Sequence, residues 1–157
     1  MSAAPAVGAI GSEARFPLKL LVDINVVLDV VLGREEFLRN SGRLLTAIDE
    51  DAGGPSILGF VAGHTVTTIH YITAKQKSRR EADAAVSDLL RIVQVVPIEL
   101  IDFTQALALD LRDFEDAVQA AAALKIGADY LVTRNPRDFI GVPGLDVRTP
   151  AQALALL

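Results

Sequence analysis

The sequence predicts an α/β protein built on a parallel β-sheet with helices covering both faces. Short aliphatic runs alternate along the chain with longer stretches in which apolar residues recur at helical spacing. Polar residues do not alternate with apolar ones along these runs, and such a pattern is typical of strands that are buried on both faces. With 157 residues, of which 51% are hydrophobic, the chain can bury the core of one domain. We therefore expect a single parallel sheet of four or five strands.

The domain is expected to span residues 17–157. Residues 1–16 are rich in Ala, Gly, Ser and Pro and show no periodicity, which predicts a flexible N-terminal tail. The first expected strand, Leu-Lys-Leu-Leu-Val, ends at Asp23. Similar aliphatic runs bounded by turn residues predict the strands in order at 18–22, 56–61, 94–97, 129–133 and 145–148.

Helices are expected between and after these strands. Ser78 is a good N-cap for the clearest of them, in which Ala82 and Leu89 share one face. Asp102 and Asp113 are expected to cap the next two helices. The predicted helices span, in order, 25–32, 35–51, 65–77, 78–93, 102–111, 113–125 and 150–156.

Composition excludes several classes of protein. The absence of Cys rules out disulfides, thiolate nucleophiles, cysteine zinc sites and iron–sulfur clusters. The 15 basic and 20 acidic residues give a net charge of −5, which argues against coating nucleic acid through the overall field but leaves room for a local basic patch. No apolar run approaches a membrane span, and the N-terminus has no basic region of a secretory signal. We expect a cytoplasmic protein without membrane association.

Polar motifs occur where two expected strands end. Asp23-Ile24-Asn25 follows the first strand and 133–138 follows the fourth, at the edge of a parallel sheet where ligands bind. A third acidic motif, 113–116, opens a helix. Clustered carboxylates without Cys suit a hard cation such as Mg²⁺ or Mn²⁺, which can activate water for phosphodiester hydrolysis.

Each acid also has a structural interpretation. Asp113 and Asp116 have the spacing of an N-cap and an acidic third residue of a helix, and Asp23 suits a turn or a cap. Asp29 falls inside an apolar pattern, where we interpret it as a structural acid that orients Asn25 or nearby backbone. These alternatives stay open from the motifs alone.

Basic residues near these motifs are candidates for binding a phosphate backbone. Their alternative is the solvated end of a helix. The candidates are Lys75, Lys77, Arg79, Arg80, Arg134 and Arg137.

Other nucleotide and phosphate folds fit the sequence less well. The chain lacks G-x-x-x-x-G-K-[ST], and G-x-G-x-x-G is missing from the context that a dinucleotide fold requires. A haloacid-dehalogenase-like phosphatase requires a second Asp at position 25, which is Asn. A receiver domain requires an acidic pair and a later lysine at strand ends, and neither is correctly placed.

Taken together, these motifs resemble the PIN-domain family, and in particular the VapC-like ribonuclease toxins. The resemblance covers essentially all of 17–157 and rests on two blocks, LLVDINVVLDVVL at 20–32 and DFEDAVQAAAALKIGADYLVTRNPRDF at 113–139. It implies a three-layer α/β/α sandwich, acidic residues that hold Mg²⁺ or Mn²⁺, and cleavage of RNA. It also implies a homodimer and, for many members, a small antitoxin as partner.

The resemblance assigns roles to particular residues. Asp23 and Asp116 match acids that bind the metal, with Asp113 and Asp138 as nearby supplements, and Asn135 matches a further polar position. These five residues, together with Thr68, form the expected metal and catalytic site.

One position departs from the family pattern. The family usually has Glu in a pattern like T-x-x-E-[IL]-x-Y, and this chain has Thr68 at that position. A hydroxyl can hydrogen-bond a metal-bound water but supplies no charge, so we expect one weakly bound metal. The sequence thus predicts a metal-dependent ribonuclease, with a catalytically silent module that binds RNA or a protein as the alternative.

Overall fold

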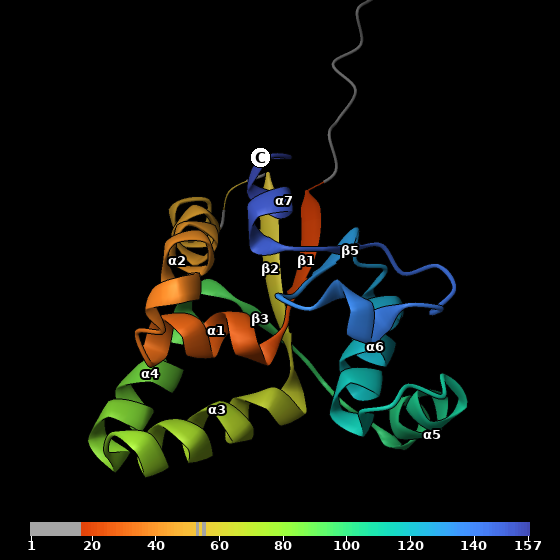
Figure 1. Ribbon diagram of the computed structural model, residues 1–157, viewed down its shortest axis with the longest axis horizontal. Coiled ribbons are helices and arrows are strands. Elements are labelled where there is room, and N and C mark those ends of the chain that lie inside the picture. The colour runs from red at the N-terminus through yellow and green to blue at the C-terminus, as the bar shows by residue number, and fades with distance from the viewer. Residues whose placement is uncertain (1–16, 53, 55) are drawn as a thin grey trace, which may run out of the picture.

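The centre of the protein is a sheet of five strands, all parallel, in the order β3-β2-β1-β4-β5 (Figure 1). The structure is a computed structural model that describes residues 17–52, 54 and 56–157, so the tail predicted for 1–16 lies outside the described residues. The strands are β1 (Leu18–Val22), β2 (Ile57–Ala62), β3 (Gln94–Val96), β4 (Tyr130–Val132) and β5 (Val147–Arg148). This confirms the predicted parallel sheet.

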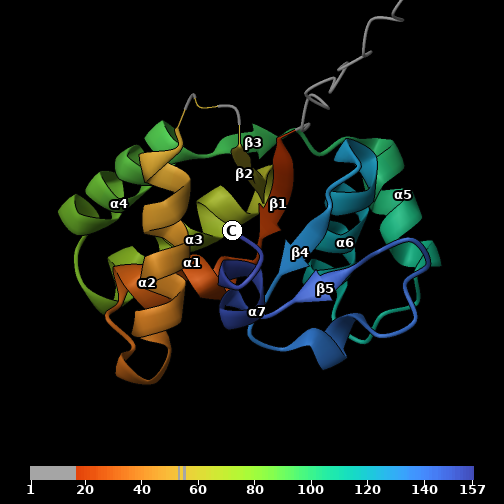
Figure 2. The same cartoon turned by 90° about the horizontal axis from the view of Figure 1, so that it is seen from above.

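Both faces of the sheet carry helices, as Figure 2 shows. Along β1, Leu20 and Val22 belong to one hydrophobic cluster and Leu21 belongs to another, because successive side chains of a strand point to opposite faces. The first cluster packs under helices α1, α2, α3, α4 and α7. These helices are α1 (Ile24–Val31), α2 (Glu35–Glu50), α3 (Gly63–Gln76), α4 (Arg79–Ile92) and α7 (Pro150–Leu154).

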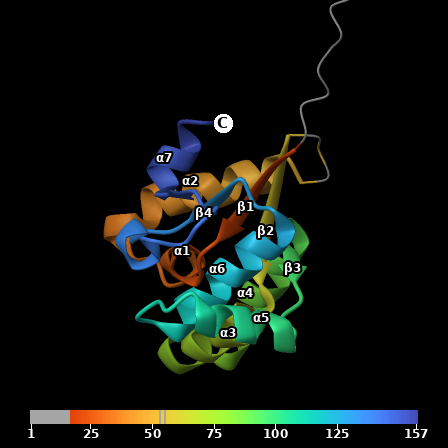
Figure 3. The same cartoon turned by 90° about the vertical axis from the view of Figure 1, so that its right-hand side faces the viewer.

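The other face is covered by α6 (Phe114–Ile126) and the short 3₁₀ helix η1 (Pro136–Phe139). Helix α5 (Leu100–Ala108) packs against α6, as Figure 3 shows. Helix α6 lies next to the sheet and buries a run of small residues, 120–123, that are all alanine. Their short side chains let the helix approach the sheet closely. The result is a three-layer α/β/α sandwich, which confirms the expected fold class.

Two of the predicted caps are present and one is wrong. The Ser78 hydroxyl accepts a hydrogen bond from the backbone N–H of Glu81, and the Asp113 carboxylate caps α6 by accepting from Asp116. The helix predicted at 102–111 instead begins at Leu100 and ends at Ala108. Glu99 is its N-cap, and Asp102 sits three residues further on.

Asp102 has a different partner because of tertiary structure. Its side chain is buried, accepts from the backbone N–H of Glu99, and lies 2.8 Å from the Nζ of Lys125 on α6. Asp102 therefore serves as the third residue of a capping box with Glu99, which places the helix start upstream, and it also pairs with a lysine 23 residues away. Predicted boundaries elsewhere differ by a few residues, and the sequence did not predict η1.

Among the described residues, every helix is too short or too polar to cross a bilayer.

Candidate active site

The site lies at the point where the order of the strands reverses. The chain passes from β1 outward to β2 and β3, and β4 then returns to the other side of β1. Asp23 directly follows β1 and Thr133 directly follows β4, and these strands are paired with Val22 opposite Val132. Open parallel sheets bind ligands at such a switch point, beyond the carboxyl ends of the strands.

Asp23 is held at this point in an unusual way for a residue that precedes a helix. It occupies the N-cap position of α1, but its side chain makes no capping hydrogen bond. Its Oδ2 instead accepts a hydrogen bond from the Thr133 hydroxyl at 2.9 Å, and its Oδ1 is buried without a partner. Burial raises the pKa of the Asp23 carboxyl above its usual value, and favourable contacts with the side chains of Gln119 and Thr133 and with the backbone of 24–25 partly offset this effect. A buried acid with one free oxygen is suited to binding a ligand.

A pocket of about 270 Å³ opens beside this acid. It is formed by the first turns of α1 and α6, the middle of α3, and the loop that leads from β4 into η1. Its polar lining residues are Asp23, Asn25, Thr68, Asp113, Glu115, Asp116, Asn135 and Asp138. The fold therefore brings together the residues that we predicted as catalytic or metal-binding from four separate parts of the chain.

Asp116 lies among several other acids of this pocket. Burial and the negative charges of Asp113, Asp23, Asp138 and Glu115 raise the pKa of Asp116 to about 7. Burial and neighbouring acids also raise the pKa of Glu115. The repulsion between these carboxylates is relieved when one of them binds a proton or when a cation binds between them.

The residues of the pocket fit a hard divalent cation. They offer carboxylate and amide oxygens, which Mg²⁺ and Mn²⁺ prefer, and the unpaired Asp23 Oδ1 and Glu115 Oε1 are buried atoms in need of a partner. Within 17–52, 54 and 56–157, however, no three His, Asp or Glu side chains form a ready cluster for an ion. An ion at Asp23 and Asp116 would therefore take most of its remaining ligands from water.

Comparison with known protein families shows to which family this chain belongs. The family profile described as PIN domain matches residues 19–137, most of the chain. The chain belongs to the PIN domain family. The matched region includes both Asp23 and Asp116, which confirms the resemblance found in the sequence. A search of curated protein sequences finds no match.

Solved structures share the fold of this PIN domain. VapBC2 from Rickettsia felis, bound to a DNA fragment from its promoter, is 13% identical with a TM-score of 0.66, over 84% of this chain and 98% of that chain. A toxin–antitoxin complex from Klebsiella pneumoniae is 24% identical with a TM-score of 0.61, over 83% and 97%. VapC20 of Mycobacterium tuberculosis, a toxin that cleaves the sarcin–ricin loop, is 18% identical with a TM-score of 0.59, over 71% and 86%.

Thr68 lines the pocket of the PIN domain at the position where the sequence pattern calls for glutamate. Its hydroxyl donates to the backbone oxygen of His64 at 3.3 Å. With its proton used in this way, the oxygen can accept a hydrogen bond from a water in the pocket. Thr68 therefore contributes an acceptor without charge.

The predicted RNA-binding residues do not gather at the pocket. Lys75 lies seven residues beyond Thr68 on α3, or about 10 Å along the helix, and Figure 1 shows the turn between α3 and α4 remote from the strands. Lys77, Arg79 and Arg80 follow Lys75 at this turn.

The two arginines of the loop after β4 differ from each other. Arg137 is exposed on η1, beside the pocket residue Asp138. Arg134 turns inward, with its Nε 3.4 Å from the buried Asp29 and its guanidinium 4.0 Å from the ring centroid of Phe37. The geometry gives Arg134 a structural partner, and its predicted contact with RNA stays a prediction.

Sequence reasoning missed several residues that shape the site. Gln119 is fully buried in α6 and accepts from the backbone N–H of Ile24 through Oε1. It is the only polar residue in a run of alanines, and this signal was available. Thr133 could have been found as the counterpart of Asp23 on the neighbouring strand. The partners of Asp29, which include Arg34, had no local signal.

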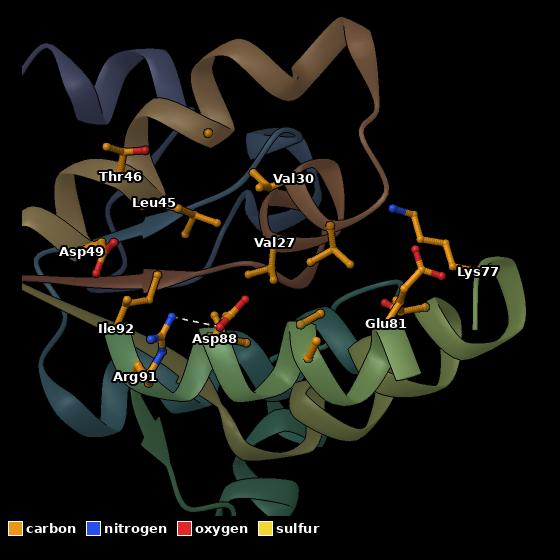
Figure 4. Close-up of a pocket in the computed structure, with 16 residues that line it drawn as sticks. Val27, Val30, Leu45, Thr46, Asp49, Lys77, Glu81, Asp88, Arg91 and Ile92 are labelled. Carbon is orange, nitrogen blue, oxygen red and sulfur yellow. Dashed lines mark hydrogen bonds and ion pairs between the residues drawn. The ribbon is translucent and has the colours of Figure 1, made fainter. Parts of the chain in front are cut away.

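A second, larger hollow of about 600 Å³ lies away from the pocket, between α4 and the pair α1 and α2 (Figure 4). Val27, Val30, Leu45 and Ile92 give it an apolar lining. Charged side chains stand among them, namely Asp49, Lys77, Glu81, Asp88 and Arg91. This groove holds none of the predicted catalytic acids.

The raised pKa of Asp116 predicts how pH affects the metal-free protein. The folded protein keeps this proton up to about pH 7, whereas the unfolded chain releases it near 3.8. The stability that Asp116 contributes by binding the proton is therefore fully present below pH 4 and is lost as the pH rises through 7. We expect a loss of roughly 1–2 kcal/mol between pH 5 and pH 8 after allowing for solvent screening. The Asp116→Asn variant should lose less stability over the same pH range.

Urea unfolding in the presence of a chelator, at both pH values, measures this difference. Equal pH dependence in wild type and Asp116→Asn would contradict the prediction. Adding Mg²⁺ or Mn²⁺ at pH 8 should raise the unfolding midpoint of wild type more than that of Asp116→Asn.

Proposed function

We propose that this PIN domain is a metal-dependent endoribonuclease that acts as the toxin of a toxin–antitoxin pair. The observation that carries the proposal is the pocket at the switch point, where the unpaired oxygen of buried Asp23 lies among acids that raise the pKa of Asp116. Membership of the PIN domain family and the fold shared with VapC toxins support the same reaction class.

The residues predicted as catalytic or metal-binding have separate roles in this proposal. Asp23 and Asp116 would hold Mg²⁺ or Mn²⁺, with Asp113 and Asp138 within the same pocket to add charge. The ion would offset the charge of the scissile phosphate and make water a better nucleophile. Asn135 and Thr68 would orient water by hydrogen bonds.

A cation and a proton compete for the acids of this site. Asp116 binds a proton up to about pH 7 in the metal-free protein, so a cation has to displace that proton. We therefore expect cleavage to rise from pH 6 to pH 8.

Incubating the purified protein with single-stranded and structured RNA tests the proposal. Products should appear with Mg²⁺ or Mn²⁺ and should disappear when a chelator is added. RNA that is bound but intact across both metals would favour the second candidate, a silent RNA-binding module. That candidate is favoured by Thr68, which leaves the pocket without the family's glutamate.

An antitoxin would bind in the groove between α1, α2 and α4 in this proposal. The apolar lining with charges at Glu81 and Arg91 suits an amphipathic segment of a partner protein. The solved structures of similar fold include toxin–antitoxin complexes. Co-purification with the product of an adjacent gene, lost in Val30→Glu, tests this assignment.

A second copy of the chain would bind the exposed face of α5. The only charged residue of this helix, Asp102, is buried, so two such faces could meet without charge repulsion. Large apolar side chains stand exposed there, in a patch on the order of several hundred Å²: Leu100, Ile101, Phe103, Leu107 and, stacked on Phe103, Phe114. Sedimentation equilibrium should give a dimer for wild type and a monomer for Leu107→Glu.

A further inference from the structure

Asn25 lines the pocket from the first turn of α1, and its amide oxygen faces Arg34. Its Oδ1 accepts from the Nη1 of Arg34 at 3.5 Å. An arginine side chain carries only donors, so the amide oxygen has to face Arg34 and the amide nitrogen has to face away from it. That nitrogen is a donor that Arg34 cannot use.

Arg34 is itself held in place by a buried acid. Its Nη1 lies 3.4 Å from the Oδ1 of Asp29, and its backbone N–H donates to the backbone oxygen of the same residue at 2.9 Å. Asp29 is fully buried and receives further contacts from the Ser41 hydroxyl at 3.0 Å and from Arg134. The orientation of Asn25 is therefore set by a network that spans α1, α2 and the loop after β4.

The amide nitrogen of Asn25 is a neutral donor in a pocket whose charged side chains are all acids. Mg²⁺ and Mn²⁺ bind oxygen, so an amide N–H₂ group cannot serve as a ligand for them. It can donate to an anionic acceptor, and phosphate oxygens are the commonest acceptors in contacts with nucleic acids. A donor at this position would hold a phosphate against the acids without competing for the cation.

We propose that Asn25, oriented by Arg34, donates a hydrogen bond from Nδ2 to a phosphate oxygen of RNA bound in the pocket. This inference rests on the proposed ribonuclease function and adds a residue that binds substrate. Arg34 and Asp29 act as positioning residues, because they reach the phosphate only through the amide.

Asn25→Asp separates this role from a structural one. Aspartate has the same shape and still accepts from Arg34, so it leaves the contacts between Arg34 and Asp29 in place. The proposed role predicts a loss, because the donor becomes an anion. Asn25→Ala removes the donor without adding charge, and a loss in both variants locates the effect in the amide N–H₂ group.

The measurement is the affinity for a short fluorescein-labelled single-stranded RNA, by fluorescence anisotropy with Ca²⁺ present and a gel to confirm that the RNA stays intact. We expect about tenfold weaker binding or more for Asn25→Asp and Asn25→Ala. The matched control is Asn40→Asp, which adds the same charge at an exposed position of α2 and should bind like wild type. Thermal unfolding should show that all variants are folded, and Asn25→Ala decides the question if Asn25→Asp unfolds.

The outcomes distinguish this inference from the function on which it rests. Wild-type affinity in Asn25→Asp or Asn25→Ala would overturn the role of Asn25 and leave the ribonuclease proposal standing. A wild-type protein that neither binds nor cleaves RNA would overturn both.

Discussion

Replacing Asp23 with asparagine is expected to lower metal-dependent RNA cleavage by about 100-fold or more while the fold stays intact. The change removes one negative charge from the ion-binding pair and leaves the size of the side chain unchanged. The Thr133 hydroxyl, 2.9 Å from Oδ2, can still donate to an amide oxygen. Because burial already disfavours the charged form of Asp23, neutralising it should cost the folded state little.

Initial rates of RNA cleavage at saturating Mn²⁺ measure this effect. Asp116→Asn should behave similarly, because it supplies the second charge of the pair. Asp88→Asn is the matched control, since Asp88 lies exposed on α4 in an ion pair with Arg91. Rates within about threefold of wild type in both Asp23→Asn and Asp116→Asn would rule out the site.

Asp29→Ala is expected to lower the free energy of unfolding by about 2–4 kcal/mol. Asp29 is fully buried and joins three segments of the chain through Arg34, Ser41 and Arg134. Removing it leaves a cavity and takes the acid away from two arginines. The loss stays below that of a fully buried ion pair, because both arginines remain partly exposed and can reach water.

Urea unfolding measures the loss, and two variants calibrate it. Asp29→Asn keeps the shape and a hydrogen-bond acceptor and should lose about half as much. Asp88→Ala removes an exposed acid and should change stability by less than about 0.5 kcal/mol. An Asp29→Ala protein as stable as Asp88→Ala would show that the network contributes nothing to the fold.

Much of the site was predictable because its acids sit beside local signals. Asp23 ends an aliphatic strand, and Asp113 and Asp116 begin a helix that closes at Gly127, where φ is +61°. These signals place each acid at an element boundary. Parallel strands then bring their carboxyl ends to one edge, and the pocket at that edge contains all the predicted metal and catalytic residues.

The orientation of the polar side chains was beyond the reach of local patterns. Thr133 and Asp23 are 110 residues apart, and Arg134 and Asp29 are also on different segments of the chain. Periodicity predicts whether a side chain is buried, but it does not predict which partner it meets. Asp29 was correctly interpreted as a structural acid, while its partners were not identified.

By itself, the sequence determined the element types, the parallel sheet and the residues that could carry chemistry. It did so because burial and helix capping each require particular residue types within a few positions of the element concerned. Only the tertiary structure decided the strand order, the inward turn of Arg134 and the orientation of the Asn25 amide. These depend on contacts between distant segments, and such contacts form only when the strands pair and the helices pack.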